Sequence, residues 1–429
     1  MTRRRRAKEA KTHFGAVPAP GGGRWRWIYS TRVHLVLYSF LLVATPFLML
    51  RRFLQEAIGK LSVLSVDAFG VRVPIIPVVG AVVVTVGLVL LRRQITWGRV
   101  IVAGVVLLMN FAAQQVNDYY FDHNFYDLQQ NWHYMAYAVF AYMMYRDLAP
   151  RGYPLHRIML ITFVVAASFS TFDESFQLKM SGRAFEMGDV AKDVYGCLMG
   201  MLVVYSGPNR AGVLWRVGRK LRHEKLRDYF RDPRSLVLLM FVVAFLVLLF
   251  SSLLSNIAYA GLVLVLGLSG SAVLFVLLHV TRYAAVRYAL LALLVVAGGV
   301  QGWSLWKYRD DPNVYARPGL IFYRGVAVPF FDVLIFPDGS WRPVDKKATF
   351  MARDRQFFLK REPDIVLVGS GSAGQGGRGF PEPGVSQFLY NPYTRRGTQV
   401  IILPNAAAFR EYRRLREEGK SVLFVIHNA

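Results

Sequence analysis

One short polar stretch in an otherwise apolar region holds the residues whose types and spacing could do chemistry. Asp173 and Gln177 are four residues apart, and so are Asp189 and Asp193, so each pair would share one face of a helix. Carboxylates at membrane depth are costly unless they are paired or hydrated, which makes them candidates for acid–base catalysis, headgroup binding or proton relay. The competing interpretation is a buried network that only pins two helix ends. The full candidate cluster is Asp173, Glu174, Gln177, Arg183, Asp189, Asp193 and His133.

Neighbouring residues would complete this candidate cluster. Arg183 lies in the predicted turn between two spans, where its planar guanidinium can bridge carboxylates. His133 lies at the start of another predicted span, and an aromatic-belt residue is the equally weighted alternative. Gly196 and Gly200 continue the helix face of Asp189, and glycines there would let another helix approach closely.

The elements that must position these residues are membrane spans. Apolar residues make up 54% of the chain and charged residues only 18%, which is far from the composition of an ordinary soluble protein. A span needs about 17–25 mostly apolar residues. We expect nine spans, or eight if the short fourth and fifth candidates are miscounted. The ranges are 33–50, 73–91, 98–114, 132–146, 156–172, 189–206, 236–254, 257–280 and 283–304.

The distribution of charge predicts the orientation. The net charge of +25 is concentrated in the tail 1–32 and in short loops, whereas 115–131 has no Lys or Arg. By the positive-inside rule, the N-terminus of this multi-pass protein of the cell (inner or plasma) membrane is cytoplasmic, although the basic loop 51–72 opposes the pattern. The expected partner is an anionic inner leaflet rather than nucleic acid. The basic loop 207–235 is either an interfacial helix or a solvated linker.

The composition changes after residue 306, where charges become frequent and mixed. Strands are predicted at 331–336, 364–368, 398–403 and 421–426, with a helix at 405–418, which together suggest a small α/β layer. The glycine-rich loop 369–379 is followed by Pro381 and Pro383, which disfavour the helix that a dinucleotide site requires. The single cysteine, Cys197, excludes multi-cysteine metal sites, and we expect neither a cofactor nor a metal.

The predicted fold is therefore a polytopic α-helical membrane protein with a soluble C-terminal α/β domain. The expected units are a basic flexible tail (1–32), a bundle of about six spans (33–206), a basic interfacial segment (207–235), about three further spans (236–305) and the soluble domain (306–429).

The polar stretch carries a family resemblance over roughly residues 100–207. The ordered motifs Asp173-Glu174-x-x-Gln177, Gly182-Arg183, Asp189-Val190, Asp193 and Gly196 resemble the signature of the VanZ-like membrane family. This resemblance implies a bundle of about five spans and names no reaction. In this chain Asp193 stands where Asn is common, and no Asp-Lys pair precedes His133.

The C-terminal region has a second resemblance, over roughly residues 320–428. The segments 331–339, 362–371, 400–409 and 418–427 are similar to the small domain family that includes mitochondrial complex I assembly factor three. The resemblance implies a three-layer β/α domain that serves as a binding or assembly module. Relatives in that family work in the cytosol or mitochondrial matrix, whereas nine spans place this domain outside, so its side stays open.

Three functions follow as expectations. The first is a membrane scaffold, assembly or envelope-associated factor whose soluble domain recruits a protein partner. The second is a membrane enzyme that acts on a lipid-linked or cell-envelope substrate through Asp173, Glu174 and Arg183. The third is a proton-coupled transporter, which the absence of inverted repeats disfavours.

Overall fold

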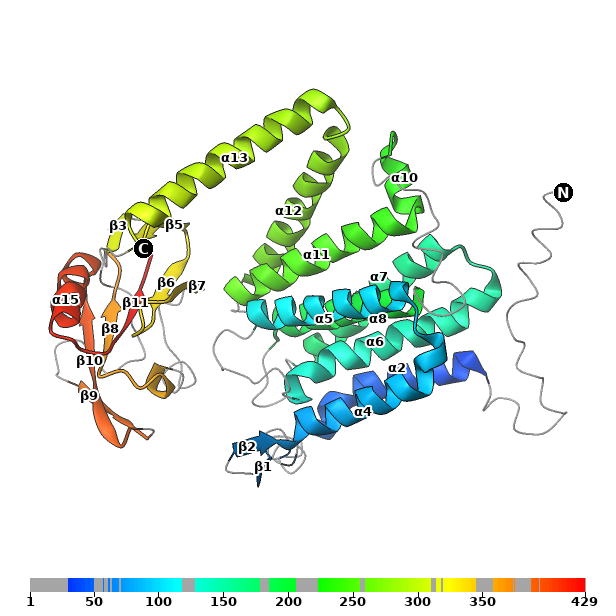
Figure 1. Ribbon diagram of the computed structural model, residues 1–429, viewed down its shortest axis with the longest axis horizontal. Coiled ribbons are helices and arrows are strands. Elements are labelled where there is room, and N and C mark those ends of the chain that lie inside the picture. The colour runs from blue at the N-terminus through cyan, green and yellow to red at the C-terminus, as the bar shows by residue number, and fades with distance from the viewer. Residues whose placement is uncertain are drawn as a thin grey trace.

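Helices dominate the computed structural model, and a β-rich domain follows them at the C-terminal end (Figure 1). The structure describes residues 30–49, 57, 61, 64–68, 71–117, 128–177, 185–205, 223–254, 259–309, 314–317, 319–344, 358–372, 374, 387–392 and 394–428. The predicted basic tail, Arg183 and the predicted interfacial helix within 207–235 lie mainly or wholly outside these residues.

A helix overlaps each of the nine predicted ranges. The helices are α2 (Thr31–Met49), α4 (Ile75–Leu91), α5 (Trp97–Asn117), α6 (Leu128–Leu148), α7 (Leu155–Gln177), α8 (Met187–Tyr205), α11 (Pro233–Leu253), α12 (Ala260–Val280) and α13 (Ala284–Lys307). A hairpin of β1 (Ser65–Ala68) and β2 (Val71–Pro74) precedes α4, and the short helix α10 (Leu226–Arg231) precedes α11.

Five of the described helices are long and apolar enough, by length and composition, to cross a membrane. They are α5, α7, α11, α12 and α13. Shorter apolar stretches occur in α2 (Thr31–Ala44) and α4 (Ile75–Gly87). The helices α6 and α8 fall outside this set, and α8 carries Asp189, Lys192 and Asp193 within its first two turns. The chain is therefore a helical membrane protein whose least apolar helices lie inside the bundle.

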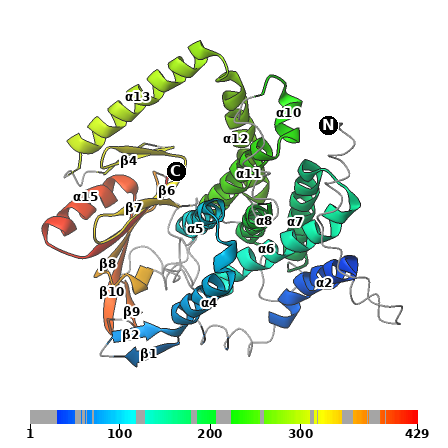
Figure 2. The ribbon, with the colours of Figure 1, turned by 45° about the vertical axis from the view of Figure 1, so that its right-hand side comes forward.

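α8 is the central helix of the bundle, since α6, α7 and α11 all pack on it (Figure 2). Its two glycines explain the closeness of α6. A Cβ atom added to Gly196 would lie 2.6 Å from the Tyr134 backbone, and one on Gly200 would lie 2.5 Å from the Ala138 backbone. The expectation that these glycines permit a close helix approach is confirmed.

The C-terminal domain is built on a mixed six-stranded sheet. Its strand order is β7 (Trp341–Val344), β6 (Asp332–Ile335), β11 (Val422–Ile426), β8 (Ile365–Gly369), β10 (Arg396–Leu403), β9 (Gln387–Asn391). Strands β8, β10 and β11 are parallel to one another. A separate antiparallel sheet contains β3 (Val314–Arg317), β4 (Leu320–Tyr323) and β5 (Val326–Pro329). The helix α15 (Asn405–Glu417) connects β10 to β11.

The side chains of the six-stranded sheet alternate between two cores. Leu367 and Phe424 face a core shared with α15 and the three-stranded sheet, whereas Val366 and Val425 face the opposite side, where Phe358 covers them. The four predicted strands and the predicted helix are confirmed, while β3, β4, β5, β7 and β9 were not expected. The helix α13, which has no buried residues, leads into this domain, and its Ser304 hydroxyl donates to the Gly325 carbonyl at 2.9 Å.

Candidate functional site

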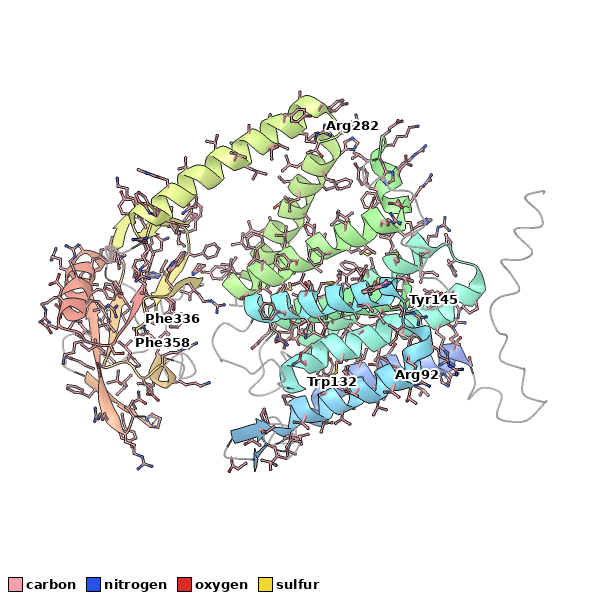
Figure 3. The ribbon with its side chains drawn as sticks, viewed as in Figure 1. Arg92, Trp132, Tyr145, Arg282, Phe336 and Phe358 are labelled. Atoms are coloured by element: carbon pink, nitrogen blue, oxygen red, sulfur yellow. The ribbon has the colours of Figure 1, made fainter. Side chains whose placement is uncertain are left out.

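Three helices of the bundle bring the predicted polar residues to one place. His133 comes from α6, Asp173 and Glu174 from α7, and Asp189 and Asp193 from α8. The cluster lies near the start of α6, at the end marked by Trp132, while Tyr145 and Arg92 lie toward the opposite end (Figure 3). The end of α7 and the start of α8 lie close together, since the Glu186 backbone N–H donates to Glu174 Oε2 at 3.0 Å.

His133 forms the centre of the cluster. Its Nδ1 lies 2.9 Å from the Asp193 Oδ1, and its Nε2 lies 3.7 Å from the Asp189 Oδ2. An ionised carboxylate can only accept a hydrogen bond, so the pair with Asp193 is satisfied when Nδ1 carries a proton. In the neutral ring Nε2 then carries the lone pair, and it faces the Asp189 carboxylate, so this nitrogen can take up and release a proton.

The two aspartates next to His133 each have a further partner. The Ser170 hydroxyl donates to the second oxygen of Asp193 at 2.6 Å, and Lys192 Nζ lies 2.7 Å from Asp189 Oδ1. The side chains of Asp193 and Lys192 are 5% and 8% exposed, whereas those of His133 and Asp189 are 25% and 23% exposed. The cluster therefore has a buried part, formed by Asp193 and Lys192, and a partly exposed part, formed by His133 and Asp189.

Glu174 and Gln177 form a second branch on α7. The Gln177 amide donates to Glu174 Oε1 at 2.9 Å, and the backbone N–H of Glu186 donates to Glu174 Oε2 at 3.0 Å. Glu174 thus ties the end of α7 to the residue just before α8. Asp173 lies next to this branch, 3.5 Å from the Gln177 amide nitrogen, and is half-buried.

Six of the seven predicted residues lie in this cluster, and the seventh, Arg183, is outside the described residues. Two further members were not predicted. Ser170 lies three residues before Asp173 on α7, and Lys192 lies three residues after Asp189 on α8, so helical spacing alone was a usable signal for both. Within the described part of the chain, His, Cys, Asp and Glu form no group of three or more that is arranged to hold a metal ion.

The partly exposed residues of the cluster, His133 and Asp189, can do acid–base chemistry. A proton taken up at His133 Nε2 would leave an imidazolium between two aspartates, and both carboxylates would stabilise that charge. Asp193 and Ser170 lie on the Nδ1 side of the ring, and the His133 side chain as a whole is 25% exposed.

Comparisons with known proteins add one partial match. No protein-family model matches the chain, and no curated protein matches it. A solved structure titled "MT938" is 21% identical over 27% of this chain and 95% of that chain, with a TM-score of 0.21.

Proposed function

We propose that the chain is a multi-pass membrane enzyme that does acid–base chemistry on the headgroup of a lipid-linked substrate. The carrying observation is the imidazole of His133, which is fixed through Nδ1 by buried Asp193, faces Asp189 with Nε2 at 3.7 Å, and has a side chain that is 25% exposed. A network that served only to pin helices would gain nothing from an accessible imidazole. Fixing one ring nitrogen through a carboxylate is how a histidine base is oriented in other active sites.

The proposed topology places this site near the outer surface of the membrane. Nine spans with a cytoplasmic N-terminus put the starts of α6 and α8 and the end of α7 on the outer side, together with the C-terminal domain. The basic residue Arg92 then lies at the inner face, where the positive-inside rule requires it. The resemblance of residues 100–207 to the VanZ-like family fits a role in the cell envelope.

The test compares the lipids of cells that produce the wild-type chain or the His133→Asn variant. An asparagine amide can still donate to Asp193 but has no counterpart of Nε2, so the variant keeps the network and loses the base. We expect a lipid species that is formed or depleted only with the wild-type chain, as measured by mass spectrometry. Equal lipid profiles at equal protein levels would count against the proposal. So would conservative variants at Asp173, Glu174 and Asp189 that do not accumulate in cells, because these residues would then be needed for folding.

A second candidate function is a membrane scaffold, which one feature of the C-terminal domain favours. Strand β9 lies at the edge of the described six-stranded sheet, and Phe388 and Tyr390 on its one face are 65% and 67% exposed. Edge strands with exposed aromatic side chains are sites where another chain can add on. The resemblance to the complex I assembly factor three family supports the same function.

This second function predicts a specific contact at β9. A photoreactive residue at position 388 should crosslink in cells to one defined protein, while the same residue at the exposed position Glu417 on α15 should not. Identical crosslinking at both positions would argue against recruitment by β9.

A further inference from the structure

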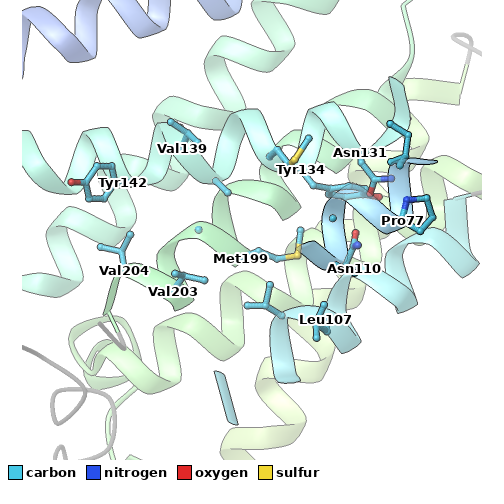
Figure 4. A pocket seen from close by; sticks show the side chains of 17 residues that line it. Pro77, Leu107, Asn110, Asn131, Tyr134, Val139, Tyr142, Met199, Val203 and Val204 are labelled. Atoms are coloured by element: carbon cyan, nitrogen blue, oxygen red, sulfur yellow. The ribbon is translucent and has the colours of Figure 1, made fainter. Parts of the chain in front are cut away.

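An open groove of about 800 Å³ lies beside the polar cluster, between α4, α5, α6 and α8 (Figure 4). This volume is within the range of about 300–1,000 Å³ that is typical of ligand sites. Aliphatic side chains such as Leu107, Val139 and Val203 form most of its wall. Asn110, Asn131 and Tyr134 lie at one end of the groove in Figure 4, and Tyr142 lies at the other end.

The length of the groove matches one leaflet of a membrane. Along α6 it runs from Asn131 to Tyr142, which at the helical rise corresponds to about 16 Å. Half of a hydrocarbon core of about 30 Å has nearly the same depth. The groove therefore has the polarity and the length of a single lipid, with its headgroup at the Asn131 end.

The polar end offers hydrogen-bond acceptors that the described residues leave unused. Tyr134 is only 5% exposed, yet its hydroxyl has no hydrogen-bond partner among the described residues, and the same holds for the side-chain oxygen of Asn110. Buried polar atoms without partners cost free energy, so they are expected to meet a ligand. An amide oxygen accepts hydrogen bonds only, which calls for a headgroup that donates.

Charge narrows the choice of headgroup further. Tyr134 lines the groove and directly follows His133 on α6, which connects the groove to the polar cluster. Among the described residues of that cluster, the four carboxyl groups of Asp173, Glu174, Asp189 and Asp193 outnumber the cationic or protonatable groups of Lys192 and His133. A site with this excess of carboxylates favours a cationic group over an anionic one.

We infer that the groove binds the acyl chains of a membrane lipid whose headgroup carries a primary ammonium, as in phosphatidylethanolamine. The ammonium donates to the Asn110 and Tyr134 oxygens, at the end of the groove that adjoins His133 on α6. This names a substrate class for the proposed acid–base site and rests on that proposal, while lipid binding itself is measurable without turnover.

The test is native mass spectrometry of the full chain in detergent, with three lipids of identical acyl chains offered at equal concentration. Phosphatidylethanolamine, phosphatidylcholine and phosphatidylglycerol separate a donating cation from a non-donating cation and from an anion. We expect phosphatidylethanolamine to be retained most. Equal retention of all three, or preference for phosphatidylglycerol, would overturn the inference.

Two variants and a matched control locate the lipid-binding site. Gly80 lines the groove and has open space around it, so Gly80→Phe fills the groove without a clash, and we expect lipid retention to fall to background. Gly298→Phe on α13, also in open space but remote from the groove, is the matched control and should bind as the wild type does. Tyr134→Phe should lower the affinity for phosphatidylethanolamine by about fivefold and leave that for phosphatidylcholine unchanged. Unchanged retention in Gly80→Phe, or a dimer whose crosslinks lie in the groove, would contradict the lipid assignment.

The two proposals can fail separately. His133→Asn should bind phosphatidylethanolamine as the wild type does, because His133 does not line the groove. If the wild type binds this lipid but converts none, the enzymatic proposal fails and the groove assignment stands. If conversion occurs without a preference for phosphatidylethanolamine, the groove assignment fails.

Discussion

His133 and Asp193 meet across the contact between α6 and α8, with Nδ1 of the imidazole 2.9 Å from a carboxylate oxygen. They are 60 positions apart in the sequence, and the close approach of the two helices is what joins them. That approach depends on Gly196 and Gly200, each of which faces the backbone of α6. The same glycines that pack the bundle thus set the geometry of the candidate site.

The first prediction concerns this helix contact. Gly200→Ala would place a Cβ 2.5 Å from the Ala138 backbone, so the helices must separate, and we expect a loss of about 1–3 kcal/mol in unfolding free energy. Gly104→Ala, in open space on α5, is the control and should be neutral or slightly stabilising, because alanine favours helix. Thermal unfolding in detergent, followed by tryptophan fluorescence, measures both. Equal melting temperatures for the two variants would show that the contact is not tight.

A second prediction concerns the ion pair of Lys192 and Asp189. Lys192 is buried and Asp189 is partly exposed, so Lys192→Met removes the cation that faces the Asp189 carboxylate. We expect a loss of about 1–3 kcal/mol, less than for a fully buried pair, because Asp189 keeps some contact with solvent. The double variant Asp189→Asn with Lys192→Met should regain part of that loss. If the two single effects simply add, the residues are not coupled.

The sequence predicts the helices better than it predicts the contacts between them. Apolar runs of span length locate α2 to α13, and the spacing of Asp189, Asp193 and Gly196 identifies a single face of α8. Nothing local indicates that this face meets His133, because pairing across helices depends on tertiary packing. Polar residues such as Gln129, Gln130 and Asn131 keep α6 outside the set of clearly apolar spans, and charged residues keep α8 outside it.

In the C-terminal domain, too, some elements are easy to predict from the sequence and others are not. Strands β8 and β11 are continuous apolar runs that are buried on both faces, and such runs are easily found. The strands of the small sheet have four residues each, and their turns at Gly319 and Gly325 have positive φ angles. These short strands lack a long apolar pattern, and the turn glycines were the signal that could have revealed them.

A third prediction concerns Asp332, which is 1% exposed and joins β6 to the end of β11. Its two oxygens accept from His427 Nδ1 at 2.9 Å and from the Asn428 backbone N–H at 2.8 Å. Asp332→Ala leaves both donors buried, and we expect a loss of about 1–3 kcal/mol in the stability of the domain. Limited proteolysis of the full chain should then cut the domain faster. Asp338→Ala, in an exposed turn, is the control. Equal cleavage of the two variants would contradict the structural role of Asp332.

A fourth prediction concerns sidedness. In a Cys197→Ser background, Lys420→Cys reports on the C-terminal domain and Arg92→Cys on the loop before α5, and both positions are exposed. With nine spans and a cytoplasmic N-terminus, a membrane-impermeant maleimide should label Lys420→Cys in intact cells. It should label Arg92→Cys only after the cells are permeabilised. Labelling of both positions from the same side would rule out the nine-span count.

The most direct test of the acid–base site is the initial rate of lipid conversion by the purified chain in nanodiscs, measured beside its melting temperature. For His133→Asn we predict a melting temperature close to that of the wild type and a rate lowered by about 10²–10⁴-fold, which is the usual contribution of a general base. A wild-type rate in this variant would contradict the account, because the imidazole would then serve only to join α6 to α8.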